Sequence, residues 1–405
     1  MPTPIIALSK DWHEDPTSNH HVLRELAKSR RVLWMNSVST RVPALSSARD
    51  LDKMRRKLLE FGRGPVNVEH DLWIATPLVV PLPHNPLARI VNRRILRSTV
   101  RRLRAHLGID RFQLWTFLPN TAPYVGTLGE ALAVYYCVDE WATFPGLDAA
   151  AIRCAERELL RRVDVTFATS MALVEAKRPL CRDVHLARHG VDHASFARAL
   201  DDDLEIPTDL AALRPPRIGF FGTLRDFIDV DAIAAVARAR PDWAIALIGQ
   251  VFTDLAPLRA LPNVHLLGRK PHADLPAYCK GFDAALIPYR TDDASRFINP
   301  LKLREYLSAG LPVVSTAIRE VEPYAHLCHI ARTHAELPEV IERALAHDTP
   351  YARRRRSVAM RSETWSTRVA AVEATVAACE RAKRDYARRE IHIPNAAAVK
   401  NMISE

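Results

Sequence analysis

A lysine and a glutamate lie one helical turn apart near the start of a well-bounded predicted helix. Residues 299–314 read NPLKLREYLSAGLPVV, in which Asn299 can cap the helix and Pro300 suits its first position. Gly310 suits the left-handed position past the helix end, and Pro312 prevents continuation. Because a helix start carries free amides and a positive dipole end, this segment favours an anion, above all a phosphate.

The positions of Lys302 and Glu305 indicate what else the helix start would bind. A cation in the first turn disfavours the helix by about a few tenths of a kcal/mol, which an anion bound beside Lys302 would offset. Glu305 shares the helix face of Lys302, and a carboxylate one turn behind a phosphate can accept hydrogen bonds from both hydroxyls of a ribose. The alternative is that Lys302 and Glu305 pair with each other on a solvated face.

Two further segments place suitable residues directly after predicted strands. Residues 217–226 read RIGFFGTLRD, and Gly222 in the turn allows a ligand to approach the backbone closely. The spacing is not GxGxxG, which counts against a dinucleotide fingerprint. Asp139 and Trp141 follow another strand, where a carboxylate suits sugar hydroxyls and an aromatic ring suits a sugar face. Asp139 could instead be a helix cap.

A polar loop follows the first predicted strand. Residues 10–21 read KDWHEDPTSNHH and include His13 and Asn19, polar residues that could line a ligand site. The histidines of this loop lack metal-ligand spacing, and the acidic run 201–203 lies in a predicted linker. We therefore expect no metal and no cofactor, with a helix dipole and a lysine where other enzymes use Mg²⁺.

These residues are carried by short apolar runs that alternate with segments of helical period. Such alternation predicts an α/β fold with parallel, doubly wound sheets, whose ligands bind outside the carboxyl ends of the strands. The predicted strands of a first sheet are Ile5–Leu8, Val32–Met35, Leu72–Ala75, Gln113–Phe117, Ala133–Cys137 and Val165–Thr169. The predicted strands of a second sheet are Arg217–Phe221, Ala244–Ile248, Val264–Leu267, Ala284–Pro288 and Val313–Thr316. Predicted helices include Ala149–Arg162, Asp229–Arg240 and Leu301–Ala309.

The composition is that of a globular protein with an excess of basic charge. The chain has 405 residues, of which 48% are hydrophobic and 26% charged, and a formal net charge of +10. No apolar run approaches the roughly 18 residues that span a bilayer, and the first residues lack the basic region of a signal peptide. The six cysteines are scattered without a CxxC pair. We therefore expect a cytoplasmic protein with reduced thiols.

The charge excess is concentrated in one amphipathic helix. Residues 88–106 contain seven arginines and no acid, and Leu96, Val100 and Leu103 recur at helical spacing. The helix could simply present a solvated basic face. It could instead contact an anionic membrane, which would place the protein peripherally at the inner face of the plasma membrane. We expect no nucleic-acid partner, because no recognition motif accompanies the charge.

The segment 299–314 resembles the donor-binding helix of family-4-type (group 1) GT-B glycosyltransferases, whose pattern ends in E-A-x-A-x-G-x-P-V-V. More narrowly, it is similar to the N-P-x-K-x-x-E-Y variant of transferases that build cell-surface polysaccharides and exopolysaccharides. The resemblance implies that Glu305 binds the ribose and that the amides of Leu301 and Lys302 hold the diphosphate. A second glutamate of the family, eight residues earlier, is replaced here by Phe297.

Other segments extend the resemblance. The loop at Gly222 and Thr223 resembles the donor loop that opens the family's C-terminal domain, and it implies that Arg225 neutralises the diphosphate together with Lys302. Residues 263–271, which read NVHLLGRKP and include Arg269, resemble the strand and loop that hold the nucleobase. Residues around Asp139 resemble an Asp-x-x-Trp-like feature, which implies a catalytic position for Asp139. The resemblance also implies that Trp141, His13 and Asn19 lie on the acceptor side.

The resemblance also implies an organisation into two Rossmann-like doubly wound domains that face each other across a cleft. We expect an acceptor-side domain at 1–195, a linker at 196–216 and a nucleotide-sugar-binding domain at 217–364. A C-terminal helix at 365–388 would cross back to the first domain, and 389–405 would be a tail.

The expected function is transfer of a sugar from a nucleoside-diphosphate sugar to a glycan or lipid-linked acceptor, with retention of anomeric configuration and without a metal. Two alternatives use the same fold: a sugar-nucleotide 2-epimerase, and a non-catalytic scaffold that binds nucleotide sugar or lipid. A dehydrogenase using NAD is disfavoured by the missing glycine fingerprint.

Overall fold

The chain folds into two compact units. The structure is a computed structural model that describes residues 2–14, 16–37, 48–82, 85–144, 146–293 and 295–391. The first unit comprises Met1–Ala168, Val174–Ala187 and Val369–Glu405, and the second comprises Thr169–Leu173 and Arg188–Arg368. The chain therefore passes from one unit to the other at 168/169, 173/174, 187/188 and 368/369.

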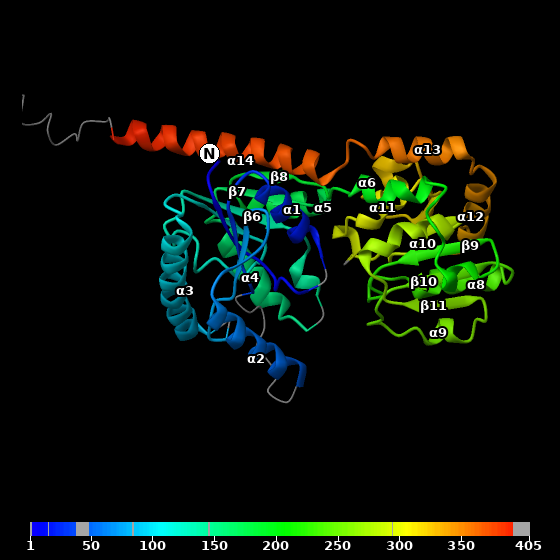
Figure 1. Cartoon of the computed structure of the whole chain (residues 1–405), viewed down its shortest axis with the longest axis horizontal. Helices are drawn as coiled ribbons and strands as arrows, with labels where there is room; N and C mark the ends of the chain where they lie inside the picture. The colour runs from blue at the N-terminus through cyan, green and yellow to red at the C-terminus, as the bar shows by residue number, and fades with distance from the viewer. Residues whose placement is uncertain are drawn as a thin grey trace, which may run out of the picture. The chain divides into compact units, whose positions relative to one another are not determined.

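Within the described residues, the first unit is built on an eight-stranded sheet in the order β3-β4-β2-β1-β5-β6-β7-β8. Figure 1 labels β6, β7 and β8 of this sheet. Neighbouring strands are parallel except β3, which is antiparallel to β4. The strands are β1 (Ile5–Leu8), β2 (Val32–Met35), β3 (Val66–Glu69), β4 (Leu72–Ala75), β5 (Gln113–Thr116), β6 (Leu132–Cys137), β7 (Val165–Ala168) and β8 (Val184–Leu186). The helices are α1 (Ser18–Ala27), α2 (Ala48–Arg63), α3 (Pro86–Leu107), α4 (Ala149–Leu160) and α5 (Met171–Lys177), which begins in the second unit.

The second unit has a six-stranded parallel sheet, counted over its described residues, in the order β11-β10-β9-β12-β13-β14. Numbered within the unit, this is the order 3-2-1-4-5-6 of a Rossmann fold, and the switch point lies between β9 and β12. The strands are β9 (Arg217–Phe221), β10 (Ala244–Ile248), β11 (Val264–Gly268), β12 (Ala284–Ile287), β13 (Val313–Thr316) and β14 (His329–Ala331). The helices are α6 (His193–Ala197), α7 (Thr208–Ala211), α8 (Val230–Ala239), α9 (Ala256–Arg259), α10 (Leu275–Gly281), α11 (Leu301–Ser308), α12 (Leu337–Ala346), α13 (Pro350–Ala359) and the start of α14 (Trp365–Ile391).

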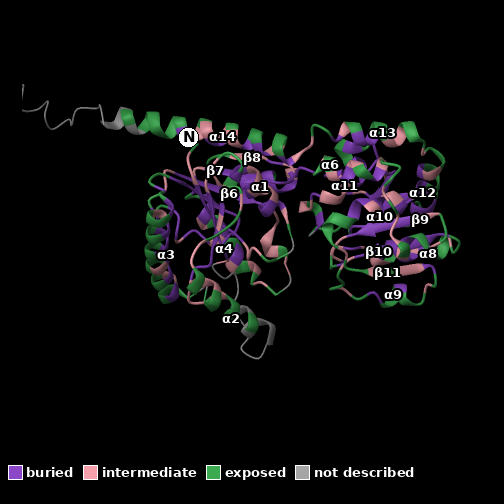
Figure 2. Cartoon of the chain, in the orientation of Figure 1, coloured by how far each residue is buried: buried purple, intermediate pink, exposed green. Residues whose placement is uncertain are grey.

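The predicted α/β fold with parallel, doubly wound sheets is confirmed in each unit. The central strands are buried along their length, as in β1, β2 and β10, because helices cover both faces of a parallel sheet (Figure 2). The apolar runs that the sequence predicts as strands all form strands with ends within one residue of the prediction. The structure adds β3, β8 and β14, three short strands near the sheet edges that the sequence does not reveal.

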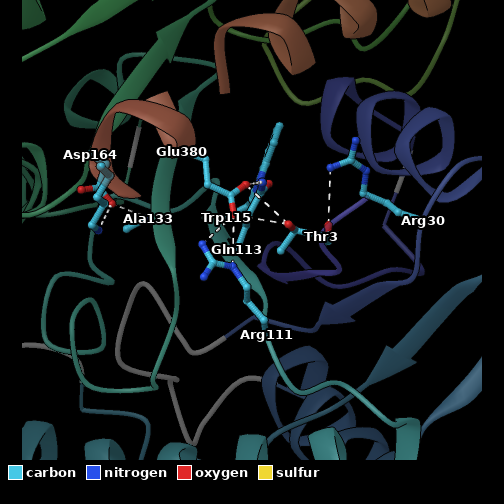
Figure 3. Close-up of polar contacts among 9 residues, drawn as sticks. Thr3, Arg30, Arg111, Gln113, Trp115, Ala133, Asp164 and Glu380 are labelled. Atoms are coloured by element: carbon cyan, nitrogen blue, oxygen red, sulfur yellow. Dashed lines mark hydrogen bonds and ion pairs between the residues drawn. The ribbon is translucent and has the colours of Figure 1, made fainter. Parts of the chain in front are cut away.

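Helix α14 is anchored to the first unit by a buried glutamate (Figure 3). The carboxylate of Glu380 accepts hydrogen bonds from Gln113 Nε2 at 2.9 Å and Arg111 Nη2 at 2.9 Å, and from Thr3 Oγ1 at 3.3 Å. One turn later, Lys383 pairs with Asp164 at 2.7 Å. The helix continues to Ile391, and the rest of the predicted tail, 392–405, lies outside the described residues.

The segment 196–216, for which the sequence predicts a linker, lies within the second unit. Asp209 at the start of α7 accepts hydrogen bonds from Lys270 Nζ at 2.7 Å and from the Tyr278 hydroxyl at 3.0 Å. Leu210 is fully buried in the core of the unit. The acidic, proline-bearing composition of this segment is typical of a linker, but these contacts hold it in the second unit.

Candidate active site

A lysine and a glycine meet at the switch point of the second sheet. Gly222 directly follows β9 and has φ +133°, and a Cβ built on it would lie 2.0 Å from Lys302 Cε. The Lys302 ammonium group is 5.9 Å from the ring centroid of Phe220 and interacts with Tyr289, which lies just beyond β12. The structure therefore brings Gly222 and Lys302 together between β9 and β12, where ligands bind in this fold.

Lys302 stays positively charged in this position. Burial lowers the pKa of the Lys302 ammonium group, but Tyr289 and Glu305 more than offset it, so that the net shift of the pKa is upward. A half-buried cation that remains protonated attracts a phosphate strongly, because little water screens it.

Helix α11 begins as the sequence predicts, but Asn299 does not cap it. The N-cap is Pro300, without a side-chain hydrogen bond to the helix, and the first residues, Leu301 and Lys302, lie in a turn whose amides have no intrahelical acceptor. The Asn299 side chain instead donates to the Thr169 carbonyl at 2.6 Å and accepts from Arg304 at 2.9 Å. The prediction of an asparagine cap was wrong because this buried amide is held by two other partners, and the amides of the helix start remain for a ligand.

Glu305 has a partner that the sequence did not indicate. His272 Nε2 lies 3.4 Å from Glu305 Oε1, and the hydrogen bond that His272 donates to Glu305 raises the pKa of His272 above its usual range. The alternative in which Glu305 pairs with Lys302 on a solvated face does not describe this site, because the Glu305 side chain is only 14% exposed. No periodic pattern could have revealed His272, which comes from the short helical turn before α10.

The remaining donor-side candidates lie nearer the surface. Arg225 is exposed, and its guanidinium group stacks on Phe252 at 5.3 Å from the ring centroid. Thr223 is half-buried next to Gly222, and Arg269 is exposed after β11. The structure thus keeps Thr223 in the loop that contacts Lys302 and places Arg225 and Arg269 on loops at the same carboxyl end of the sheet.

In the first unit, Asp139 and Trp141 follow β6, as predicted. Burial raises the pKa of the Asp139 carboxyl to about 7, against a smaller opposite effect of Lys10. Trp141 packs edge-on against Phe144, and its buried indole nitrogen has no hydrogen-bond partner among the described residues. The Asp139 carboxyl can therefore be either neutral or charged near pH 7, which suits a group that handles sugar hydroxyls.

A buried ion-pair cluster holds the loop that carries Asp139. Lys177 Nζ lies 2.6 Å from both Glu140 Oε2 and Glu156 Oε2, and the Tyr135 hydroxyl donates to Glu156 at 2.7 Å. Sequence reasoning missed Lys177 because it comes from α5, far along the chain. Removing a single member would leave a buried charge without its partner.

Two predicted acceptor-side residues occupy different environments. His13 is exposed and lines a cavity of about 160 Å³, where it lies 3.6 Å from Glu60. Asn19 is buried in α1 and donates to Ser9 Oγ at 3.0 Å, so that it supports the first loop from beneath.

The cavity beside His13 has a polar wall. Glu60 accepts hydrogen bonds from Thr76 Oγ1 at 2.7 Å and Asn36 Nδ2 at 3.3 Å, and all three residues line the cavity together with Trp12. Asn36 and Thr76 directly follow β2 and β4, so the cavity opens at the carboxyl ends of the first sheet. No motif in the sequence indicates this set of residues, because they come from separate elements that only the fold brings together.

No helix in the described part of the chain is long and apolar enough to cross a membrane. Among the residues that the structure describes, no group of three or more His, Cys, Asp or Glu side chains is arranged to hold a metal ion.

Comparison with known proteins gives one family match and a group of similar structures. Residues 215–347 match the family model "Glycosyl transferases group 1". A relative from Bacillus subtilis (strain 168), named "Putative teichuronic acid biosynthesis glycosyltransferase TuaH", is 26% identical over 280 residues, which are 64% of this chain and 70% of the relative. The sucrose-phosphate synthase of Thermosynechococcus elongatus superposes with a TM-score of 0.66 at 14% identity, covering 94% of this chain and all of that one. Anabaena HepE in complex with UDP and glucose gives a TM-score of 0.63 at 15% identity, over 92% of this chain and 99% of HepE.

The fold and these matches define a glycosyltransferase of the GT-B type. The part that matches the group 1 model, residues 215–347, lies in the second unit and includes β9, α11 and the contact between Gly222 and Lys302.

Proposed function

We propose that the protein transfers a sugar from a nucleoside-diphosphate sugar to a glycan or lipid-linked acceptor in cell-surface polymer synthesis. The observation that carries the proposal is the position of Lys302, a charged lysine held against Gly222 at the start of α11 and at the switch point of the sheet. Free helix-start amides and a fixed cation together form a site for a diphosphate.

Lys302 and the helix start would stabilise the leaving diphosphate. As the bond from the anomeric carbon to the phosphate stretches, negative charge builds on the diphosphate oxygens, and the fixed dipoles of α11 and the Lys302 ammonium group lower the energy of that state. Arg225, on the exposed loop after β9, adds a second cation. We propose that no metal is needed, because these groups supply the positive charge, and that attack on the same face of the sugar retains the anomeric configuration.

Glu305 would bind the ribose. Its carboxylate can accept hydrogen bonds from both ribose hydroxyls once His272 moves away from it, so nucleotide binding exchanges one partner of Glu305 for another. Anabaena HepE was solved with UDP and with UDP-glucose, which supports a uridine nucleotide as the first donor to test.

The acceptor would enter the first unit beside α2. This helix contributes Glu60 to the wall of the cavity near His13, while Leu58 and Leu59 of the same helix are exposed by 60% and 57%. A polar head in the cavity and a lipid chain along the exposed leucines would fit a lipid-linked acceptor.

Helix α3 supports binding of this region to an anionic membrane surface. It buries Leu96, Val100 and Leu103 as predicted, and it exposes Leu87 and several arginines. Much of the α3 ribbon is coloured as exposed in Figure 2. The exposed arginines are Arg93, Arg94, Arg97, Arg101 and Arg102. The α2 and α3 helices are linked by Arg102, which stacks on Phe61. Exposed apolar residues among arginines are typical of helices that lie on anionic lipid.

Thermal unfolding with UDP, GDP, ADP, dTDP and NAD tests the donor site. We expect one nucleoside diphosphate, at about a hundred times its dissociation constant, to stabilise the wild type by roughly 2.7 kcal/mol. Glu305→Ala should lose most of this stabilisation, whereas Glu339→Ala, on an exposed first turn of α12, should keep it. If NAD alone stabilises the protein, or no nucleotide does, the proposed donor site is wrong.

A further inference from the structure

The residue before Glu305 is a fully buried arginine. Arg304 donates to Asn299 Oδ1 at 2.9 Å and to the Tyr324 hydroxyl at 2.8 Å, and its Nε lies 3.4 Å from Glu363 Oε2. Its guanidinium group also lies over the Tyr324 ring, 5.0 Å from the centroid. The side chain thus leaves the donor face of α11 and enters the interior of the second unit.

The partners of Arg304 reach two of the points where the chain changes unit. Asn299 donates to the carbonyl of Thr169, the first residue after the 168/169 boundary. Glu363 accepts from the Tyr324 hydroxyl at 2.9 Å and pairs with Arg368, the last residue before the 368/369 boundary. We call Asn299, Arg304, Tyr324, Glu363 and Arg368 the Arg304 network.

A third boundary segment lies against the same network. The Val191 amide donates to the Glu363 carbonyl at 3.0 Å, and Val191 forms a parallel bridge with Thr364. A Cβ built on Gly190 would lie 2.5 Å from the Trp365 backbone, so the two strands of chain are in close contact. Residues 188–191, which follow the 187/188 boundary, are therefore fixed to residues 363–365.

We propose that Arg304 is a positioning residue that links the occupancy of the donor helix α11 to the segments 169–173, 188–191 and 361–368, through which the chain leaves the second unit. The inference rests on the proposed donor site. It adds that donor binding also affects these three segments, which lie outside that site. Lys302 and Glu305, which would contact the donor, flank Arg304 in the sequence, so a shift of α11 on binding moves the guanidinium group with it.

Burial makes this link stiff. A guanidinium group without solvent contact must keep its hydrogen-bond partners, because an unpaired buried charge is strongly unfavourable. When α11 shifts, Asn299 and Glu363 must therefore follow Arg304, and through them the backbone at Thr169 and Val191. A chain of groups that move together in this way is a physical basis for coupling between sites.

Hydrogen–deuterium exchange of the full chain, with and without saturating UDP, tests the link. In the wild type we expect UDP to slow exchange in α11 and, by about fivefold or more, in the peptides that contain Met171 and Val191. Tyr324→Phe removes the hydroxyl between Arg304 and Glu363 and should fold, since the ring is kept. In this variant UDP should still slow exchange in α11 and, through Asn299, at Met171, but it should lose most of its effect at Val191, which is linked through Glu363.

Arg356→Gln is the matched control. Arg356 is also a buried arginine that bonds the end of α11, donating to the Gly310 carbonyl at 2.9 Å, but its acidic partner is Asp348 rather than a boundary residue. This variant should keep the UDP effect at Met171 and Val191. Arg304→Gln should abolish that effect and also weaken UDP binding.

The outcomes separate the two proposals. If UDP slows exchange in α11 of the wild type but not in the boundary peptides, or if it slows the Val191 peptide equally in Tyr324→Phe, the role of Arg304 is refuted and the donor site stands. If neither UDP nor GDP, ADP or dTDP slows exchange in α11 of the wild type, the donor site is wrong and the role of Arg304 falls with it.

Discussion

The side chain of Lys302 occupies the space that a side chain at residue 222 would need. A Cβ on Gly222 would lie 2.0 Å from Lys302 Cε and 2.6 Å from Nζ, and the glycine has φ +133°. We predict that Gly222→Ala displaces Lys302, lowers the free energy of unfolding by about 1–3 kcal/mol and weakens nucleoside-diphosphate binding at least tenfold, roughly. Calorimetric titration with UDP measures the binding, and urea unfolding measures the stability.

Gly62→Ala is the control for this substitution. Gly62 lies in α2 with ordinary φ and no atom within 4 Å of an added Cβ, so alanine should leave nucleotide binding unchanged. Unchanged UDP affinity in Gly222→Ala would show that the position of Lys302 does not matter for the phosphate.

The pair of His272 and Glu305 should make nucleotide binding depend on pH. Glu305 raises the pKa of His272 above 6.5, so the charged pair is fully present below pH 6.5 and is lost as the pH rises through the raised pKa. Since ribose must displace His272 from Glu305, UDP should bind more weakly at pH 6 than at pH 8, by less than about tenfold. In His272→Gln this part of the pH dependence should disappear, and an identical pH profile in the two proteins would contradict the exchange of partners.

His20 should destabilise the folded chain in acid. The Thr17 amide donates to its Nδ1 at 3.2 Å and Nε2 faces the Trp12 carbonyl at 3.0 Å, an arrangement that requires the neutral ring. Burial lowers the pKa of His20 to about 4, so its contribution to stability is present above pH 6.5 and is lost as the pH falls towards 4. The loss should be about 3 kcal/mol.

Urea unfolding at pH 7, 5.5 and 4.5 measures this loss. His20→Gln can form both hydrogen bonds without a titrating ring and should show a shallower decline, whereas His106→Gln, on the exposed end of α3, should decline like the wild type. A decline in His20→Gln as steep as in the wild type would mean that other groups control acid unfolding.

The α2 and α3 helices should bind anionic vesicles. We expect the wild type to float with vesicles that contain phosphatidylglycerol, less so at high salt, and not with neutral vesicles. Leu58→Glu combined with Leu59→Glu should abolish flotation, whereas Leu266→Glu, at another exposed leucine, on β11, should not. Flotation that survives the double substitution would place the lipid contact elsewhere.

The fold could be predicted largely because its central strands are buried on both faces. Residues 5–8 and 244–248, for example, are continuously apolar, so they can be identified as buried strands without knowing which strands pair with them. The strands β3, β8 and β14 were missed because they are short and half-exposed and hold residues such as Asn67 and His185, so that they lack such a pattern.

Helix α11 could be predicted from the sequence because its boundaries and its two charged residues are local, whereas its donor-binding role stays a prediction. Lys302 and Glu305 lie within one turn, and Gly310 has φ +78°, as expected past a helix end. The partners of these residues could not be predicted from the sequence. His272 beside Glu305, Tyr289 beside Lys302 and the contacts of Arg304 all depend on strands and turns that only the folded chain brings together. The roles that the sequence assigns to Asp139, Arg225 and Arg269 stay predictions.

The uneven division of the chain between its two units affects how parts of the gene could be exchanged by recombination. Apart from Thr169–Leu173, the second unit is encoded by one unbroken stretch, Arg188–Arg368, whereas the first unit is assembled from three separated stretches. Exchange of this one internal stretch of the gene could therefore replace nearly all of the second unit while leaving the first unit intact. The exchanged stretch would have to match Thr169–Leu173, because the Met171 amide donates a hydrogen bond to Glu320 and the Asn299 side chain donates one to the Thr169 carbonyl. Such exchanges would succeed most readily between chains that share this short segment.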